Sequence, residues 1–176
     1  MKSRKNQKGY VSTEVGIAVF IIGVLALAGF LSSQFLVNDA NSSVTVGQTI
    51  DTVKNIRNKY RYQGDFTNLS TAEVINLNAA PKTMISGTTL LNSYGGTADY
   101  TPTTCTNAND CIQLVQTRLP SDACMNYVNG IVEISDTIDV EGNPVKESGI
   151  YTIDQSTLST ACAAAANEVT SVHTKI

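Results

Sequence analysis

A long uncharged segment near the N-terminus constrains this chain more than any other feature. Between Glu14 and Asp39 there is no Asp, Glu, Lys or Arg, and most of the residues are apolar. A helix of this length is long enough to cross a bilayer. The first nine residues contain no acid and four basic residues, Lys2, Arg4, Lys5 and Lys8. Because basic residues are retained on the cytoplasmic side of a membrane, the following domain is expected outside the cytoplasm.

Two positions at the front of this segment distinguish it from other apolar N-termini. Gly9 ends the basic leader, and Glu14 places a carboxylate five positions later. A secretory signal peptide has no use for this carboxylate, and its cleavage site would follow the apolar run, as at Ala26–Ala28. A charge near the middle of a bilayer costs about 2.5–3.5 kcal/mol on insertion scales. The remaining alternative is a membrane anchor on a periplasmic binding protein, with Glu14 at the interface.

This N-terminus resembles that of type IV prepilins, in which a short basic leader ends in glycine and glutamate is the fifth mature residue. The resemblance implies that a prepilin peptidase cuts after Gly9 and that Tyr10, the first mature residue, is N-methylated. It also implies that Glu14 attracts the α-amine of Tyr10 on a neighbouring subunit inside a filament. The match has departures, because the commonest class begins with Phe and many pilins carry Ile or Leu at the position of Thr13.

Composition and motifs narrow the possible functions. The 176 residues carry a net charge of −3, and removal of the leader leaves 8 basic against 15 acidic residues, a net charge of −7. An acidic domain argues against nonspecific nucleic-acid binding. The single histidine, His173, has no adjacent acid, and no catalytic triad spacing is present. We therefore expect a protein that is not an enzyme and that uses no cofactor.

Hydrophobic spacing predicts an α+β fold in which a long helix packs on an antiparallel sheet. We divide the chain into a leader (1–9), a long helix (10–62) with a membrane segment at about 15–37, and a globular domain (63–176). In the second half of the helix, apolar residues recur at helical spacing, at Val46, Ile50, Val53, Ile56 and Tyr60. The first half is an apolar rod that needs cover from lipid or from other subunits.

The globular domain shows alternating helix, turn and strand signals. Ser70 and Glu73 form a capping-box pattern for a short helix that stops before Pro81, and Tyr94-Gly95-Gly96 marks a turn. The strand predicted at 112–119 directs Ile112 and Leu114 toward the core, with Val115 as a further candidate. The later expected elements are a helix over 120–130 ended by Gly130, a strand over 131–140, a turn at 141–144, a strand over 145–153, a helix over 156–167 and a strand over 169–176.

Four cysteines indicate disulfides, because an even number in an exported domain is typical of a disulfide framework. Three pairings are possible. Cys105 and Cys111 flank a turn, whereas Cys124 and Cys162 each fall in a helical pattern, so the favoured pairs are Cys105–Cys111 and Cys124–Cys162. A zinc site is disfavoured, because there is no C-x-x-C pair and only one histidine.

Two further groups of side chains have alternative interpretations. Asp136, Asp139 and Glu141 could bind Ca²⁺, but they alternate with apolar residues and lack the EF-hand pattern, which favours a solvated strand face. Tyr60 and Tyr62 could stack on a ligand, and the preferred interpretation is that they anchor the helix end to the domain.

The order of elements over nearly the whole chain resembles the type IVb pilins, including the thin-pilus pilins of conjugative plasmids. The pair Cys124–Cys162 is similar to the disulfide that bounds their C-terminal region, although their leaders are often longer than nine residues. The resemblance implies a major pilus subunit of a Gram-negative bacterium, and it leaves open whether the pilus serves adhesion, conjugation, aggregation or twitching. The subunit would be stored in the inner membrane and then assembled with identical subunits, by the pilus machinery, into an extracellular filament. A minor pilin or a type II secretion pseudopilin has the same N-terminus and is the alternative.

Overall fold

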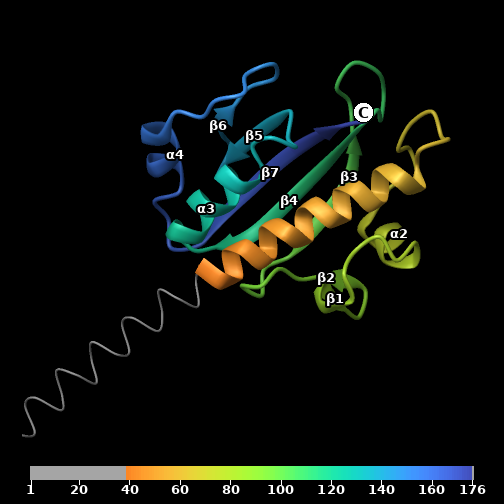
Figure 1. Cartoon of the computed structure of the whole chain (residues 1–176), viewed down its shortest axis with the longest axis horizontal. Helices are drawn as coiled ribbons and strands as arrows, with labels where there is room; N and C mark the ends of the chain where they lie inside the picture. The colour runs from red at the N-terminus through yellow and green to blue at the C-terminus, as the bar shows by residue number, and fades with distance from the viewer. Residues whose placement is uncertain (1–38, 176) are drawn as a thin grey trace, which may run out of the picture. The chain divides into compact units, whose positions relative to one another are not determined.

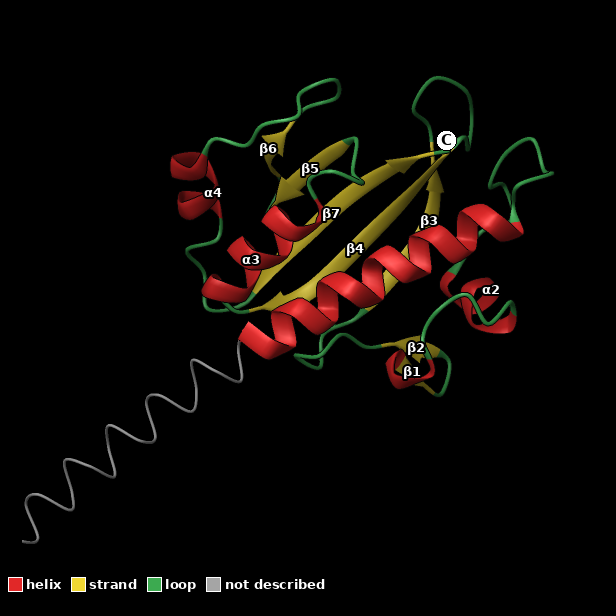
Figure 2. Cartoon of the chain, in the orientation of Figure 1, coloured by secondary structure: helices red, strands yellow, loops and turns green. Residues whose placement is uncertain are grey.

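One helix crosses one face of an antiparallel sheet, with smaller helices beside it, in this computed structural model (Figure 1). The structure describes residues 39–175. The helix covers 39–59 and is followed by a turn at 60–62. Figure 2 shows it passing in front of β3 and alongside β4, roughly along the strands of the sheet. The fold is therefore α+β with an antiparallel sheet, as the sequence predicted.

The main sheet of the described residues has five antiparallel strands in the order β3-β4-β7-β5-β6. They are β3 (Ala98–Thr103), β4 (Cys111–Leu119), β7 (Asn167–Thr174), β5 (Thr137–Val140) and β6 (Asn143–Lys146). The last strand along the chain, β7, lies between β4 and β5 and pairs with both, so the C-terminal region is joined to the sheet through its centre.

Short elements complete the fold. They are the helices α2 (Thr71–Asn76), α3 (Ser121–Ile131) and α4 (Gln155–Ala161), the 3-10 turn η1 (Lys82–Met84), and a small hairpin of β1 (Ile85–Ser86) and β2 (Thr89–Leu90). One apolar cluster lies among the first helix, α2 and the start of β4. A second lies where α3 and α4 pack near β5 and β7.

Local signals located several of these elements correctly. Ser70 caps α2 by accepting a hydrogen bond from the N–H of Glu73 at 3.2 Å, and the helix ends before Pro81. The expected turn at 94–96 is present, and Gly95 there has a φ of +73°, which glycine adopts without steric cost. The strand predicted at 112–119 is β4, although Gln116 is buried where Val115 was the candidate, because alternation continues past Leu114.

The predicted strand over 131–140 is mostly wrong. Ile131 ends α3 as a buried residue, and the Ser135 N–H and hydroxyl both donate to its carbonyl oxygen. The chain therefore turns through 132–136, and only Thr137–Val140 forms a strand. Gly130 does not end α3, which continues to Ile131.

The later boundaries also differ from those predicted. The strand expected over 145–153 is replaced by Asn143–Lys146 and a loop, in which Gly149 has a φ of +78°. The helix expected over 156–167 stops at Ala161, with Cys162 as its C-cap, and Asn167 already belongs to β7. Both differences shorten the regular elements of the C-terminal region in favour of loops.

Candidate functional site: the first helix and the disulfide-bounded region

The side of the 39–59 helix that lies against the sheet is polar over most of its length. The residues that it buries there carry hydroxyl groups at helical spacing and are Ser42, Thr45, Thr49 and Thr52. Thr49 Oγ1 lies 3.2 Å from Tyr127 Oη and accepts a hydrogen bond from Gln116 Nε2 at 3.2 Å. Gln116 Oε1 accepts a hydrogen bond from Asn92 Nδ2 at 3.0 Å. This network joins the helix to β4, to α3 and to the turn before β3.

The burial of this network has an electrostatic consequence. Burial raises the pKa of Tyr127 to about 12, so the phenol stays protonated and can act as a donor or an acceptor. Polar groups buried without partners destabilise a fold, whereas paired ones specify a single arrangement. The hydrogen bonds therefore fix the rotation of the helix about its axis as well as its position.

The end of the same helix packs through apolar side chains. Val53, Ile56 and Tyr60 are buried, and the rings of Tyr60 and Phe66 lie 5.3 Å apart between centroids. Tyr60 thus anchors the end of the helix to the domain, as the sequence suggested. Tyr62 does not, because its side chain is 93% exposed.

Gly130 allows α3 to approach the first helix closely. A Cβ atom at Gly130 would lie 2.6 and 2.8 Å from the two methyl carbons of Val46. The side chain of Val46 has little rotational freedom in a helix, because it is branched at Cβ. Packing between the two helices, rather than helix termination, is therefore the structural reason for glycine at position 130.

Two glycine-to-alanine substitutions are expected to have opposite effects. Gly130→Ala should lower the free energy of unfolding by about 1–3 kcal/mol, because it overpacks the contact with Val46. Gly47→Ala should raise it by about 0.5–1 kcal/mol, because Gly47 lies inside the helix and a Cβ there meets nothing within 4 Å. Thermal unfolding of the full chain in detergent, followed by near-ultraviolet circular dichroism of the tyrosines, measures both. Equal shifts for the two variants would contradict this account of Gly130.

All four cysteines lie in the described residues and form the two favoured pairs. Cys124 in α3 bonds to Cys162 at the end of α4, with 5.7 Å between their Cα atoms, and both are fully buried. The enclosed segment contains β5, β6 and the loop between β6 and α4. We call residues 124–162 the disulfide-bounded region.

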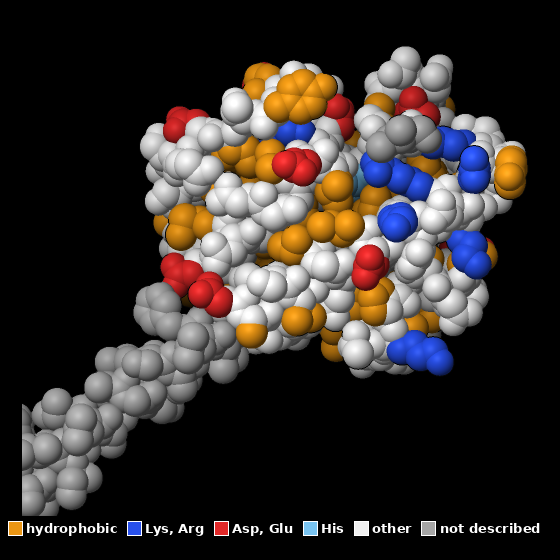
Figure 3. Space-filling view, viewed as in Figure 1, with side chains coloured by type: hydrophobic (Ala, Val, Ile, Leu, Met, Phe, Trp, Pro, Cys, Tyr) orange, Lys and Arg blue, Asp and Glu red, His pale blue; other side chains and the backbone are white. Residues whose placement is uncertain are grey.

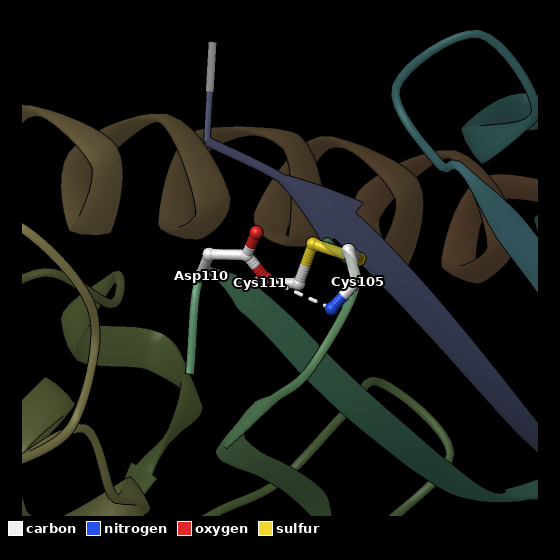
Figure 4. A group of neighbouring side chains, drawn as sticks. All are labelled: Cys105, Asp110 and Cys111. Carbon is white, nitrogen blue, oxygen red and sulfur yellow. Dashed lines mark hydrogen bonds between the residues drawn. A yellow bond between two sulfur atoms is a disulfide. The ribbon is translucent and has the colours of Figure 1, made fainter. Parts of the chain in front are cut away.

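The second disulfide, Cys105–Cys111, closes the turn between β3 and β4 (Figure 4). The Asp110 carboxylate accepts hydrogen bonds from the N–H groups of Cys105, Thr106 and Asn107 at 2.8, 3.1 and 2.7 Å. These bonds hold the pKa of Asp110 below its usual value. Cys105, Asp110 and Cys111 are close enough to resemble a metal site. The sulfurs of Cys105 and Cys111 are joined in a disulfide, however, and only a free thiolate would bind a metal.

Comparison with known proteins identifies the family to which this fold belongs. The family model described as PilS N terminal matches residues 39–174, which is most of the chain. The chain belongs to the PilS family of type IV pilins.

Two crystal structures show the same fold as this pilin at low sequence identity. One is a type IVb pilin from Salmonella typhi, with a TM-score of 0.58 and 19% identity over 73% of this chain and 97% of that chain. The other is TcpA, a type IV pilin from the El Tor biotype of Vibrio cholerae, with a TM-score of 0.57 and 14% identity over 77% and 99%. The comparison with curated protein sequences gives no match. The family match and the two structural matches indicate a structural protein.

The single histidine of this pilin is part of the core. His173 is fully buried in β7, where Nδ1 lies 3.0 Å from the Ile134 carbonyl oxygen and Nε2 lies 3.0 Å from Ser171 Oγ. Burial lowers the pKa of His173 to about 4, so the ring is neutral at neutral pH. The strand position was expected, whereas the burial was not.

Two of the three carboxylates that are candidates for Ca²⁺ binding accept hydrogen bonds from nearby groups in this pilin. Asp136 accepts a hydrogen bond from Ser148 Oγ at 2.9 Å, and Glu141 accepts one from the Glu168 N–H at 2.6 Å. Within the described residues, they do not belong to a group of side chains close enough to share a metal.

The residues predicted to act in processing and assembly, Gly9, Tyr10 and Glu14, lie outside the described residues, as does the predicted membrane segment. Within residues 39–175, no helix has both the length and the hydrophobicity to cross a membrane. The described structure is therefore that of the domain that follows the predicted membrane segment.

The polar network of this pilin is what sequence reasoning missed. Val46 and Ile50 were expected to face the domain, but both are only half-buried, and the residue before each, Thr45 and Thr49, is fully buried instead. A signal was present, because Ser42, Thr45, Thr49 and Thr52 follow the same helical spacing as an apolar stripe.

Proposed function

We propose that this pilin is the major structural subunit of a type IVb-like pilus and that it polymerises with identical subunits through its N-terminal helix. The observation that carries the proposal is the coincidence of Gly9, Glu14 and an uncharged segment upstream of a domain with a pilin fold. The likeness to two type IV pilins supports it.

The same N-terminus suggests the route to the filament. Segment 15–37 holds the subunit in the inner membrane, and the basic leader keeps the N-terminus in the cytoplasm. A prepilin peptidase removes residues 1–9, and the amine of Tyr10 is methylated. The pilus machinery then moves the subunit from the membrane into an extracellular filament.

The physical reason for assembly is the need to cover apolar surface. The 39–59 helix packs on its own domain through two surfaces. One is its hydroxyl face, made of Ser42, Thr45, Thr49 and Thr52, and the other is the apolar end at Tyr60. The apolar residues that precede it would be exposed in water unless lipid or neighbouring subunits surround them. Exchange of a lipid environment for the helices of other subunits keeps that surface covered throughout assembly.

N-terminal processing is the first test of this proposal. Mass spectrometry of the membrane-extracted protein is expected to find Tyr10 as the first residue, with one additional methyl group on its amine. A retained Met1, or a start after Ala28, would contradict the prepilin interpretation. The anchored binding protein, which the pilin family match disfavours, predicts an uncleaved N-terminus.

A minor pilin or a type II secretion pseudopilin would share this processing. The two cysteine pairs and the substantial domain favour a pilus. Electron microscopy of purified mature subunits distinguishes the alternatives, because a major subunit should form filaments alone and a minor one should not.

A further inference from the structure

We propose that a pocket beside the C-terminal half of the first helix binds a carboxylate through Arg57 and Lys146. The pocket has a volume of about 330 Å³. The lining residues that matter for binding are Arg57, Ser135, Lys146, Ile150, Tyr151 and Thr174. They come from the first helix, the turn after α3, β6, the loop that follows β6 and the end of β7. The site thus combines the first helix with the disulfide-bounded region.

Arg57 is the first reason to expect an anion. Its Nε atom is buried and, within the described residues, has no hydrogen-bond partner. A buried donor without a partner is destabilising, and a guanidinium presents its N–H groups in a planar fork that matches a carboxylate. Burial also lowers the pKa of Arg57, because the guanidinium is partly removed from water.

Lys146 is the second reason, because it lines the same pocket and only 6% of its surface is exposed. The group donates hydrogen bonds to the carbonyl oxygens of Ser135 and Asp136, the second at 3.3 Å. An ammonium has three N–H donors, so one remains for a ligand.

The acidic residues that line the pocket do not neutralise these cations by contact. Glu133 is exposed, and Asp136 accepts the hydrogen bond from Ser148. In the described part of the chain, no carboxylate lies within 4.0 Å of Arg57 or Lys146. Burial lowers the pKa of Lys146, and the charge of Asp136 offsets only part of that effect. Burial also lowers the pKa of the neighbouring His173, and the charges of Arg57 and Lys146 lower it further. Two cations therefore line the pocket, and neither has a carboxylate of the described residues in contact with it.

Exposed apolar side chains at the rim suggest what the carboxylate is attached to. Tyr151 is 87% exposed and Ile150 is 44% exposed. An exposed aromatic ring offers a flat surface for the C–H face of a sugar or for an apolar side chain. Figure 3 shows basic side chains gathered over the C-terminal half of the first helix on one face of the molecule. The chemistry fits a small monocarboxylate with an organic body, either an acidic sugar or the acidic side chain of a neighbouring subunit.

Binding is tested with the full chain in detergent micelles, labelled with ¹⁵N at arginine Nε. The Arg57 signal, assigned by its loss in Arg57→Gln, is expected to shift saturably with sodium acetate and with glucuronate, but not with glucose. Arg57→Gln and Lys146→Met should each weaken glucuronate binding about tenfold or more, measured by calorimetry. Arg61→Gln is the matched control, because Arg61 lies four residues further along and is exposed.

Tyr151→Ala tests the pocket without the risk of misfolding, because Tyr151 is exposed and removal of its ring should leave the core intact. This variant should weaken glucuronate binding several-fold and leave acetate binding unchanged. The proposal is overturned if neither carboxylate gives a saturable shift, or if Arg61→Gln weakens binding as much as Arg57→Gln does.

A second measurement identifies the source of the carboxylate and, unlike the first, rests on the proposed filament. If a neighbouring subunit supplies it, subunits bind glucuronate, sheared filaments do not, and Arg57→Gln lowers filament yield while Arg61→Gln does not. If the ligand is free, filaments bind glucuronate as well and Arg57→Gln assembles normally. Failure to form any filament leaves the micelle experiment unaffected, so the two proposals fail separately.

Discussion

Glu14→Val is expected to weaken subunit association in the filament by about two to four decades, and so to lower filament yield, while membrane insertion and cleavage after Gly9 continue. Valine removes the charge and keeps the apolar character of the segment, and the cleavage site lies upstream of the substitution. The α-amine of Tyr10 on a neighbouring subunit would then enter the filament core without its carboxylate partner. Loss of one partner of a buried ion pair typically costs about 3–5 kcal/mol, which corresponds to that change in an association constant.

The measurement compares sheared pilus fractions and membrane fractions by blotting. Glu14→Asp is the matched control, because it keeps the charge on a shorter side chain and should retain part of the yield. Equal amounts of mature subunit in the membranes of all strains would show that insertion and processing are unaffected. Wild-type filament yield from Glu14→Val would remove Glu14 from the assembly mechanism and agree with the anchored binding protein.

The elements that could be predicted from the sequence are those set by local chemistry. Ser70 caps α2 because a side-chain oxygen can accept the N–H of Glu73 whatever the rest of the fold does. β4 and β7 were found because long runs of alternating residues occur where one face of the sheet is buried. The α+β class follows from these elements together with the first helix.

The boundaries that failed depend on contacts between distant residues. The apolar residues over 131–134 resemble a strand, but Ile131 is drawn into the packing of α3, and the chain then turns at Ser135. Ile150 and Tyr151 also resemble strand residues, yet they lie exposed at the rim of the pocket. At Ile131, tertiary packing overrides the strand propensity of the local sequence. Ile150 and Tyr151 depart from the rule that apolar residues are buried.

The candidate site divides in the same way. Gly9, Tyr10 and Glu14 follow from a linear motif and stay predictions outside the described residues. The spacing of Ser42, Thr45, Thr49 and Thr52 was a signal for a buried polar face. The partners of that face and the pocket of Arg57 and Lys146 could not be predicted, because the residues involved lie far apart in the chain. Thr49 bonds to residues 67 and 78 positions away, and Arg57 lines a pocket together with residues from β6 and β7.

The two disulfides are expected to differ in their contribution to stability, and their connectivity is open to direct measurement. In the chain-entropy model, a crosslink stabilises a fold more when it closes a longer loop. Cys105 and Cys111 are 6 positions apart, so their disulfide should contribute about 2 kcal/mol. Cys124 and Cys162 are 38 positions apart, so theirs should contribute about 4 kcal/mol. Burial adds to this difference, because Cys124 and Cys162 are fully buried whereas Cys105 is exposed. A serine at position 162 would place a hydroxyl in the apolar cluster shared by α3 and α4.

Cys162→Ser should therefore lower the free energy of unfolding by about 4 kcal/mol and Cys105→Ser by about 2 kcal/mol. Many domains have only 5–15 kcal/mol in total, so the first variant should also accumulate poorly after export. Chemical denaturation of the full chain in detergent measures both, and the paired variants Cys124→Ala/Cys162→Ala and Cys105→Ala/Cys111→Ala control for unpaired thiols. Peptide mapping without reduction should link Cys105 to Cys111 and Cys124 to Cys162. A Cys111–Cys124 link, or a larger loss from the Cys105 variants, would contradict the view that α3 and α4 are held together mainly by their own crosslink.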